Sequence, residues 1–280
     1  MTDSDKIHDE VSSFYAKAVA GVADPGGCCG GASSCGIAGL AGYDADSVSD
    51  VPDDAVASSF GCGNPVAFSG VEPGDVVLDL GSGAGIDIIL AGHKVGPSGH
   101  VIGVDMTGDM IAHARANIAE AGLENVEVRE GLIEALPVDD SSVDWVISNC
   151  VINLSPDKPA VFAEIARVLK PGGRMLISDI VVESLPDWIR DSQYLYSACV
   201  AGAIGETAYV AGLREAGLAE VEVRDRMVYD AAQVCGLIAS EIPPADIAAS
   251  GEDMLRKVAA EVEGKIWSAS VYARKPLVPT

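Results

Sequence analysis

Between residues 71 and 180, segments with the apolar pattern of buried strands alternate with segments that have the pattern of helices. Nearly continuous apolar runs, typical of strands buried on both faces, occur in "VVLDL" (76–80) and "VDWVISN" (143–149). A third run, "GHVIGVDMT" (99–107), is of the same kind, and "IDIILAGHK" (86–94) and "TGDMIAHARANIAEAG" (107–122) have helical character. This β-α-β-α series predicts a mostly parallel sheet with helices on both of its faces.

The later part of the chain supplies the remaining strands. "RVLKPGGRMLISD" (167–179) predicts a helix, a turn and a fifth strand, and residues 206–225 predict a helix, a turn at Gly217 and another strand. "KIWSASVYARK" (265–275) predicts a final antiparallel strand, which gives seven strands in total. Residues 230–263 are acidic and helical in character, and we expect them to form a C-terminal insertion or a cap over a pocket.

Composition and charge narrow the classes of function. The chain has 280 residues and a net charge of -24, so nucleic acid and anionic membranes are disfavoured as partners. No apolar run approaches the length of a membrane span, and the acidic start has no secretory pattern, so we expect a cytoplasmic protein. Seven cysteines in such a chain indicate reduced thiols rather than a disulfide framework.

A glycine-rich turn follows the first strand. Gly81, Gly83 and Gly85 permit positive φ and let backbone N–H groups approach a ligand, with a helix N-terminus behind them. A dinucleotide fingerprint needs a small sixth residue, whereas Ile86 is bulky. The G-x-G-x-G pattern after Asp79 instead resembles the first motif of the Rossmann-like S-adenosylmethionine-dependent methyltransferases.

The second strand ends in a carboxylate with nucleoside-binding spacing. Asp105 lies twenty positions after Gly85, where it can accept hydrogen bonds from both ribose hydroxyls, although it could instead only cap the following helix. The resemblance implies that Met106 flanks the adenine and that Ile133 and Glu134 lie beside the base. The cofactor set that we predict with this resemblance is Asp79, Gly81, Ser82, Gly83, Gly85, Asp105, Met106, Ile133, Glu134 and Asn149.

Three cysteines belong to segments that can reach the ligand edge of the sheet. Cys150 directly follows the fourth strand, and ligands of open α/β sheets bind at the carboxyl ends of the strands. Cys62 precedes the first strand, and Cys199 lies after the fifth. Each cysteine taken alone is as well explained as a small packing residue.

The sequence segments that flank these cysteines resemble one particular family of methyltransferases. "FGCGNP", "ISNCVINLS" and "LYSACVAGA" resemble the arsenite methyltransferases, which carry thiols at these three places. "VSSFYAKAVAG" and the cysteine-rich "GGCCGGASSCG" resemble that family's N-terminal arm, so the likeness covers roughly residues 10–275. One departure is Ile152, where some relatives have a further cysteine.

The resemblance implies a substrate and a reaction. Trivalent arsenic is soft and prefers thiolates, so Cys62, Cys150 and Cys199 would hold arsenite or its thiol conjugates. The arsenic lone pair would attack the methyl group of S-adenosylmethionine without a general base, provided that the two are held in line. Neighbouring thiols would then reduce the arsenic and be restored by thioredoxin or glutathione. Cys28, Cys29 and Cys35 on the arm, and Cys62, are candidates for that role. The resemblance implies that one arm thiol pairs with Cys62, and of the three we favour Cys29.

Other interpretations remain open at this stage. A methyltransferase of a small organic acceptor, such as a quinone precursor, would make the thiols incidental, and a non-catalytic metalloid-binding protein would ignore S-adenosylmethionine. A zinc site is disfavoured because paired C-x-x-C ligands are missing. Cys235, the tryptophans and the scattered histidines, His8 among them, are interpreted as packing or surface residues.

The sequence therefore predicts an arsenite methyltransferase with a Rossmann-like α/β fold. We expect an N-terminal arm over residues 1–65, an S-adenosylmethionine-binding core over 66–180, and a substrate-site segment with the remaining strands over 181–280.

Overall fold

The computed structural model describes residues 3–22, 51–59, 70–192, 195–196, 199–230, 232–234 and 257–277. Cys28, Cys29, Cys35, Cys62 and Cys235 lie outside these ranges, as does most of the expected insertion at 230–263. Short helical stretches at 232–234 and 257–262 are the part of that insertion that is described.

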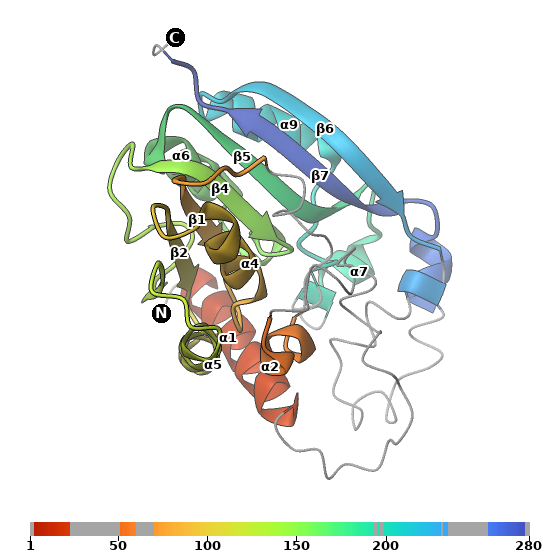
Figure 1. Cartoon of the computed structure of the whole chain (residues 1–280). Helices are drawn as coiled ribbons and strands as arrows, with labels where there is room; N and C mark the ends of the chain where they lie inside the picture. The colour runs from red at the N-terminus through yellow and green to blue at the C-terminus, as the bar shows by residue number, and fades with distance from the viewer. Residues whose placement is uncertain are drawn as a thin grey trace.

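A seven-stranded sheet in the order β3-β2-β1-β4-β5-β7-β6 forms the centre of the molecule (Figure 1). Its strands are β1 (Val76–Leu80), β2 (His100–Asp105), β3 (Val126–Glu130), β4 (Val143–Asn149), β5 (Leu169–Val182), β6 (Ala219–Val228) and β7 (Ile266–Arg274). The first five run parallel, and β7 pairs antiparallel with both β5 and β6. The predicted Rossmann-like sheet, with its antiparallel last strand, is confirmed.

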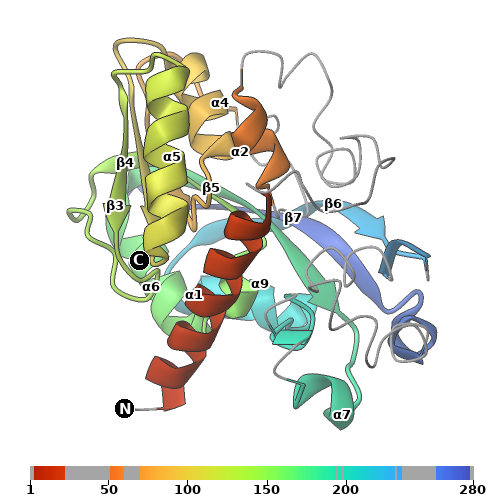
Figure 2. The same ribbon diagram turned by 90° about the horizontal axis from the view of Figure 1, so that it is seen from below.

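Helices cover both faces of the sheet, as expected from the nearly continuous apolar strands (Figure 2). The helices α4 (Ile86–Val95) and α5 (Gly108–Glu120) pack on the face that carries Val77 of β1. The helices α6 (Lys158–Val168) and α9 (Glu206–Glu215) pack on the opposite face with Leu78. This alternation along β1 is what a doubly covered strand requires.

Short elements and one long helix complete the fold. They are α1 (Asp3–Val22), α2 (Asp53–Ala57), η1 (Ile152–Leu154) and α7 (Asp187–Arg190). The long helix α1 lies beneath the carboxyl ends of the strands, next to α5 (Figure 2). Its buried Val11 packs with Leu154, and Val19 packs against Ala84 and Met110. The N-terminal region, predicted only as an arm, thus contributes a helix to the ligand edge.

The turn expected at "KPGG" is absorbed into the sheet. Helix α6 ends at Val168, and β5 begins at Leu169, without a separate turn between them. The ladder between β4 and β5 instead shifts register between the pairs Val143–Leu169 and Trp145–Arg174. An irregularity of this kind accommodates the extra residues while both strands continue.

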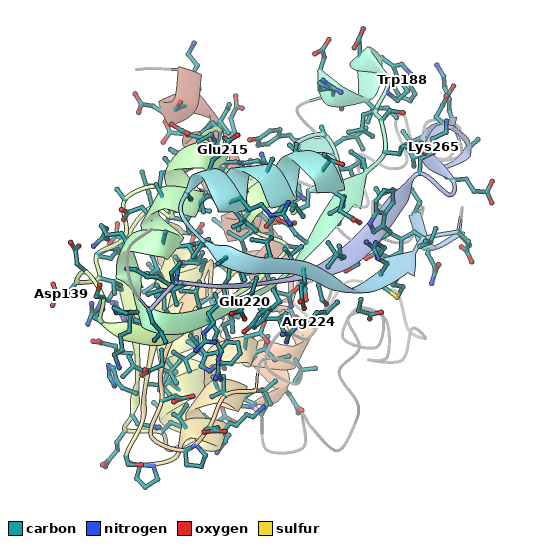
Figure 3. All side chains as sticks on the ribbon, turned by 90° about the horizontal axis from the view of Figure 1, so that it is seen from above. Asp139, Trp188, Glu215, Glu220, Arg224 and Lys265 are labelled. Carbon is teal, nitrogen blue, oxygen red and sulfur yellow. The ribbon has the colours of Figure 1, made fainter. Side chains whose placement is uncertain are left out.

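Charged side chains protect the outer strand β6 from pairing with a strand of another molecule. Its exposed positions include Glu220, Glu222, Arg224 and Arg226, two of which are labelled in Figure 3. The Arg224 guanidinium lies 3.4 Å from the centre of the Tyr272 ring on β7. Charged side chains along an edge strand oppose pairing with a second copy of the chain.

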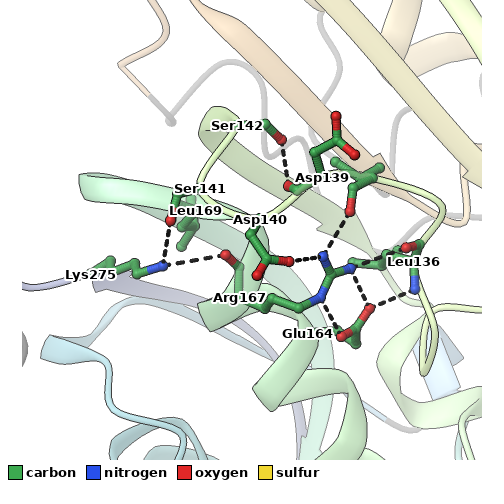
Figure 4. A network of polar contacts seen from close by, with 10 residues as sticks. Leu136, Asp139, Asp140, Ser141, Ser142, Glu164, Arg167, Leu169 and Lys275 are labelled. Atoms are coloured by element: carbon green, nitrogen blue, oxygen red, sulfur yellow. Dashed lines mark hydrogen bonds and ion pairs between the residues drawn. The ribbon is translucent and has the colours of Figure 1, made fainter.

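The loop between β3 and β4 is fixed to α6 by Arg167 (Figure 4). The Arg167 guanidinium donates to the carbonyl oxygens of Leu136 at 3.1 Å and Val138 at 2.8 Å. It also donates to both oxygens of Glu164, each at 2.7 Å, and Glu164 in turn accepts a hydrogen bond from the Leu136 N–H at 2.7 Å. This loop therefore has its position set by a charged network rather than by regular pairing.

Replacing Arg167 should test how much this network stabilises the fold. We expect Arg167→Ala to lower the free energy of unfolding by about 1–3 kcal/mol, because two loop carbonyls and Glu164 lose a charged donor. Arg226→Ala is the control, since the Arg226 side chain pairs with Glu206 alone among the described residues, at an exposed site, and its loss should cost less than about 1 kcal/mol. Urea unfolding of both variants measures the difference, and equal losses would contradict the interpretation.

Candidate active site

A cavity opens at the carboxyl ends of β1, β2 and β4, where strand order reverses and ligands of such sheets bind. It measures about 900 Å³ with its open mouth, and α1 contributes His8, Val11 and Tyr15 to its wall. None of the described residues that line it is lysine or arginine. The carboxylates in the lining, Asp87, Asp105 and Glu134, therefore favour a neutral or cationic ligand over an anionic one.

The glycine-rich turn forms the floor of this cavity. Gly81, Gly83 and Gly85 all have positive φ, as the sequence predicted, and Gly85 precedes the first turn of α4. A Cβ at Gly81 would come within 2.5 Å of the Val151 side chain, whereas one at Gly83 would meet nothing within 4 Å. Gly81 thus permits close packing against the segment after β4, and Gly83 leaves the cavity open.

The carboxylate of Asp105 is held by two backbone donors. Gly83 N–H donates to one oxygen at 2.9 Å, and Thr107 N–H donates to the other at 2.8 Å. Burial raises the pKa of Asp105, although these hydrogen bonds oppose the rise. Asp105 therefore ties the glycine turn to the start of α5.

Two more carboxyl groups lie close to Asp105. Asp87 lines the cavity and accepts a hydrogen bond from Asn149 Nδ2 at 3.2 Å. Asp79 is 2% exposed, and its Oδ1 has no hydrogen-bond partner among the described residues. Burial, then the charges of Asp87 and Asp105, raise the pKa of Asp79 well above its usual value. Such a cluster favours a ligand that brings positive charge or hydrogen-bond donors.

The other predicted cofactor residues line the same cavity: Ser82, Met106, Ile133, Glu134 and Asn149. Ser82 Oγ is buried and has no hydrogen-bond partner among the described residues. Glu134 accepts a hydrogen bond from Ser155 Oγ at 2.5 Å and lies 3.1 Å from His8 Nε2. The structure thus brings the predicted set to one place, with Asp79 and Gly85 beside the lining residues rather than among them.

Helix α1 supplies residues that sequence reasoning missed. His8 was interpreted as a surface or packing residue, but it lines the cavity and contacts Glu134 from the opposite side of the mouth. Val11 and Tyr15 reach the same wall. The spacing of Ile7, Val11 and Tyr15, four residues apart, marks one face of a helix and was the available signal.

The two described cysteines are in contact. Cys199 Sγ donates to the backbone carbonyl of Cys150 at 2.8 Å, and Cys150 N–H donates to Ser178 O at 2.8 Å. Both have left-handed backbones, with φ of 59° at Cys150 and 57° at Cys199. Residues with a Cβ rarely adopt this conformation, which costs roughly 1–2 kcal/mol, and Ser141 and Glu220 are the other described residues that do so.

One of the two described cysteines is oxidised in this structure. Cys150 takes part in a disulfide bond in this structure. Within the described residues, no three His, Cys, Asp or Glu side chains are grouped as a metal site. Cys62 and Cys29, the other cysteines predicted to act, lie outside the described residues, so their predicted roles stay predictions.

A buried polar cluster lies beside the two thiol-bearing segments. Asn153 Nδ2 donates to Asp179 Oδ1 and to the Ile180 carbonyl, both at 2.7 Å, and Tyr209 OH donates to Asp179 Oδ2 at 3.4 Å. Lys158 Nζ donates to the Asn153 carbonyl at 3.3 Å. Burial raises the pKa of Asp179 to about 7, although the Lys158 ammonium opposes the rise.

Known proteins share this fold and much of this sequence. A methyltransferase domain family matches residues 71–225. The crystal structure of an arsenic(III) S-adenosylmethionine methyltransferase from Chlamydomonas reinhardtii superposes with a TM-score of 0.66 and 34% identity, covering 84% of this chain and 73% of that one. The chain therefore belongs to the methyltransferase family that includes this arsenic(III) methyltransferase.

Curated relatives agree with this assignment. Arsenite methyltransferase of Halobacterium salinarum is 51% identical over 203 residues, which are 72% of this chain and 52% of that protein. Arsenite methyltransferase of Aquipseudomonas alcaligenes is 38% identical over 210 residues, which are 71% of this chain and 58% of that protein. The chain spans little more than half the length of these relatives. No helix among the described residues is long and apolar enough to cross a membrane.

Substitutions at Gly81 and Gly83 can separate the packing role of the glycine turn from its role in ligand binding. Both Gly81→Ala and Gly83→Ala place a Cβ at positive φ, but only the first also creates a clash, with Val151. We expect Gly81→Ala to lower the free energy of unfolding by about 1–3 kcal/mol more than Gly83→Ala does. Gly83→Ala, which fills open cavity, should instead weaken binding of S-adenosylhomocysteine. Thermal unfolding and calorimetric titration would check both effects, and identical behaviour of the two variants would contradict them.

The buried Asp179 should make stability depend on pH. Its carboxyl stays protonated in the folded protein up to about pH 7, whereas in the unfolded chain it ionises near pH 4. Stability from this group is therefore present below about pH 4 and is lost as the pH rises to about 7. In Asp179→Asn the side-chain oxygen can still accept from Asn153, and its NH₂ can donate to Tyr209 OH.

The difference in the free energy of unfolding between Asp179→Asn and the wild type isolates the contribution of the Asp179 carboxyl group. We expect the free energy of unfolding of Asp179→Asn to increase relative to the wild type from about pH 4 to about pH 7 and to level off above that. Urea unfolding across this range measures the difference. A difference that does not change with pH would show that Asp179 is already ionised in the folded protein at acidic pH.

Proposed function

We propose that this protein transfers the methyl group of S-adenosylmethionine to trivalent arsenic held by cysteine thiolates. The observation that carries the proposal is the contact between Cys199 and Cys150, both in left-handed conformations, with Cys150 lining the cavity formed by the glycine turn. Small packing cysteines need no such backbone. The arsenite methyltransferase of Halobacterium salinarum and the arsenic(III) methyltransferase of Chlamydomonas reinhardtii point to the same substrate.

The cavity has features that fit S-adenosylmethionine, which when bound supplies an electrophilic methyl group on a positively charged sulfur. Asp105 offers acceptor sites suited to ribose hydroxyls, and the partly buried Met106 and buried Ile133 offer apolar surface suited to an adenine ring. The unpartnered oxygen of Asp79 and the nearby Asp87 suit the ammonium group of such a ligand. The lack of lysine and arginine in the described lining also favours a cationic ligand.

The substrate would be held by sulfur because arsenic(III) is soft and binds thiolates in preference to carboxylates or imidazoles. Cys150 and Cys199 would supply two of these ligands, and Cys62 the third. The arsenic keeps a lone pair after binding three sulfurs, so it has no proton to lose and no residue need act as a general base. The work of the chain is to orient the arsenic toward the cavity and to exclude water.

The reaction also requires an exchange of electrons. Formation of the arsenic–carbon bond formally oxidises arsenic(III) to arsenic(V), and two electrons from a pair of thiols return it to arsenic(III) as a disulfide forms. The disulfide bond in which Cys150 takes part is in keeping with such a cycle. A thiol reductant such as thioredoxin or glutathione would regenerate the thiols, and Cys29 is our candidate on the N-terminal arm.

Product analysis with single cysteine variants tests the function. The reduced protein is incubated with arsenite, S-adenosylmethionine and glutathione, and methylated arsenic is separated and measured by mass spectrometry. We expect methylated product from the wild type and at least a hundredfold less from Cys150→Ser and from Cys199→Ser, because a hydroxyl is a poor ligand for a soft ion. Cys235→Ser, to which no role is assigned, is the matched control.

Three outcomes would contradict the proposal. If the wild type binds S-adenosylhomocysteine but forms no methylated arsenic, the acceptor is a different molecule, such as a small organic one. If it binds arsenite but not S-adenosylhomocysteine, the protein is a metalloid-binding protein without transferase activity. Equal product from the wild type and both serine variants would remove Cys150 and Cys199 from the substrate site.

A further inference from the structure

We propose that Gly202, by its lack of a side chain, sets the distance between the Cys150 and Cys199 sulfurs and so acts as a positioning residue for arsenic. This inference rests on the proposed function, in which both thiols bind one arsenic atom. Gly202 contacts neither sulfur itself. It acts through Asn153, which belongs to the segment that carries Cys150.

The segment after Cys150 has a fixed position. Asn153 is fully buried, and its amide NH₂ bonds to Asp179 Oδ1 and to Ile180 O on β5, each at 2.7 Å. Cys150 N–H is bonded to Ser178 O on the same strand. Residues 150–153 are therefore attached to β5 at both ends and have little freedom to move.

The Cys199 segment rests directly on this fixed segment. A Cβ built on Gly202 would lie 2.1 Å from the carbonyl oxygen of Asn153, far inside any real contact, and 3.1 Å from the Tyr196 ring. Tyr196 OH donates to Leu154 O at 3.2 Å, and Cys199 Sγ donates to Cys150 O at 2.8 Å. The two segments are thus as close as their backbones permit only because residue 202 has no side chain.

Arsenic binding requires a narrow range of sulfur positions. Two or three thiolates can bind the same small atom only if all of them reach it at once, and binding sites of this kind tolerate displacements of only about 0.5 Å. A side chain at position 202 must push residues 199–203 away from Asn153, because the obstructing atom is backbone held to β5. The expected consequence is loss of simultaneous coordination rather than loss of either thiol.

The chain offers a matched control for this substitution. Gly205 lies three residues further along, and a Cβ there would meet only Val182 O, at an ordinary 3.5 Å. Neither Gly202 nor Gly205 has positive φ, so alanine at both sites is free of backbone strain. Any difference between Gly202→Ala and Gly205→Ala therefore reports the contact with Asn153.

The experiment uses the full chain with Cys28, Cys29, Cys35 and Cys235 replaced by serine, so that arsenite can meet only Cys62, Cys150 and Cys199. The protein is reduced with a phosphine, since a dithiol would compete for arsenic. Arsenite binding is measured by calorimetry, and the number of sulfurs on arsenic by X-ray absorption. S-adenosylhomocysteine binding and thermal unfolding are measured alongside, because a merely structural defect would change those as well.

We expect Gly202→Ala to weaken arsenite binding about tenfold or more and to reduce the number of sulfurs on arsenic, with S-adenosylhomocysteine affinity unchanged. Gly205→Ala should match the parent protein in every measurement. Unchanged arsenite affinity and sulfur number in Gly202→Ala would overturn the inference, as would an equal loss of affinity for S-adenosylhomocysteine. If Gly202→Ala does not fold, Tyr196→Phe removes the hydrogen bond to Leu154 O without added volume and should weaken arsenite binding about threefold; no effect would overturn the inference.

Failure of the proposed function gives a different result. In that case the parent protein itself does not bind arsenite, or Cys150→Ser and Cys199→Ser bind it as well as the parent does. The inference about Gly202 then fails together with the proposed function on which it rests. If the parent binds arsenite through both cysteines and Gly202→Ala behaves as the parent does, the inference alone is wrong.

Discussion

The pairing of β1 with β4 at the centre of the parallel sheet is the constraint on which the site depends. Strand order reverses here, so the turn after β1 and the segment after β4 emerge side by side at the same edge. Gly81 makes this proximity possible, since a side chain there would collide with Val151, the neighbour of Cys150. The cofactor turn and a thiol are therefore adjacent because of backbone pairing, before any side-chain interaction is considered.

Charge then determines what the cavity can hold. Asp79, Asp87 and Asp105 lie close together at its inner end, and no lysine or arginine of the described chain lines it. Carboxyl groups this close raise one another's pKa unless a positive ligand or hydrogen-bond donors compensate. The arrangement is costly in isolation and favourable with a cationic nucleoside, which is why we interpret it as a binding site rather than as part of the core.

The thiol side of the site depends on a different set of forces. Cys150 and Cys199 have strained backbones that persist because the buried hydrogen bond between Asn153 and Asp179 and the partly buried one of Tyr196 hold the surrounding segments in place. Helix α1 adds a third element, bringing His8 to Glu134 across the mouth of the cavity. The site thus combines one rigid sheet edge with two segments that are fixed to it by polar contacts.

Much of this arrangement was determined by the sequence alone. The strands β1, β2 and β4 and the helices α4 and α5 follow from local periodicity, and the glycine turn and Asp105 follow from short-range spacing, because both signals come from residues close together in the chain. The sequence also placed Cys150 at the ligand edge, since a residue after a parallel strand has only one edge to occupy. Tertiary structure decided the rest: that Cys199 meets Cys150, that α1 brings His8 to Glu134, and that Asn153 and Gly202 set the contact. These contacts join residues between 49 and 126 positions apart, and they arise from how packed segments share space, which no local pattern records.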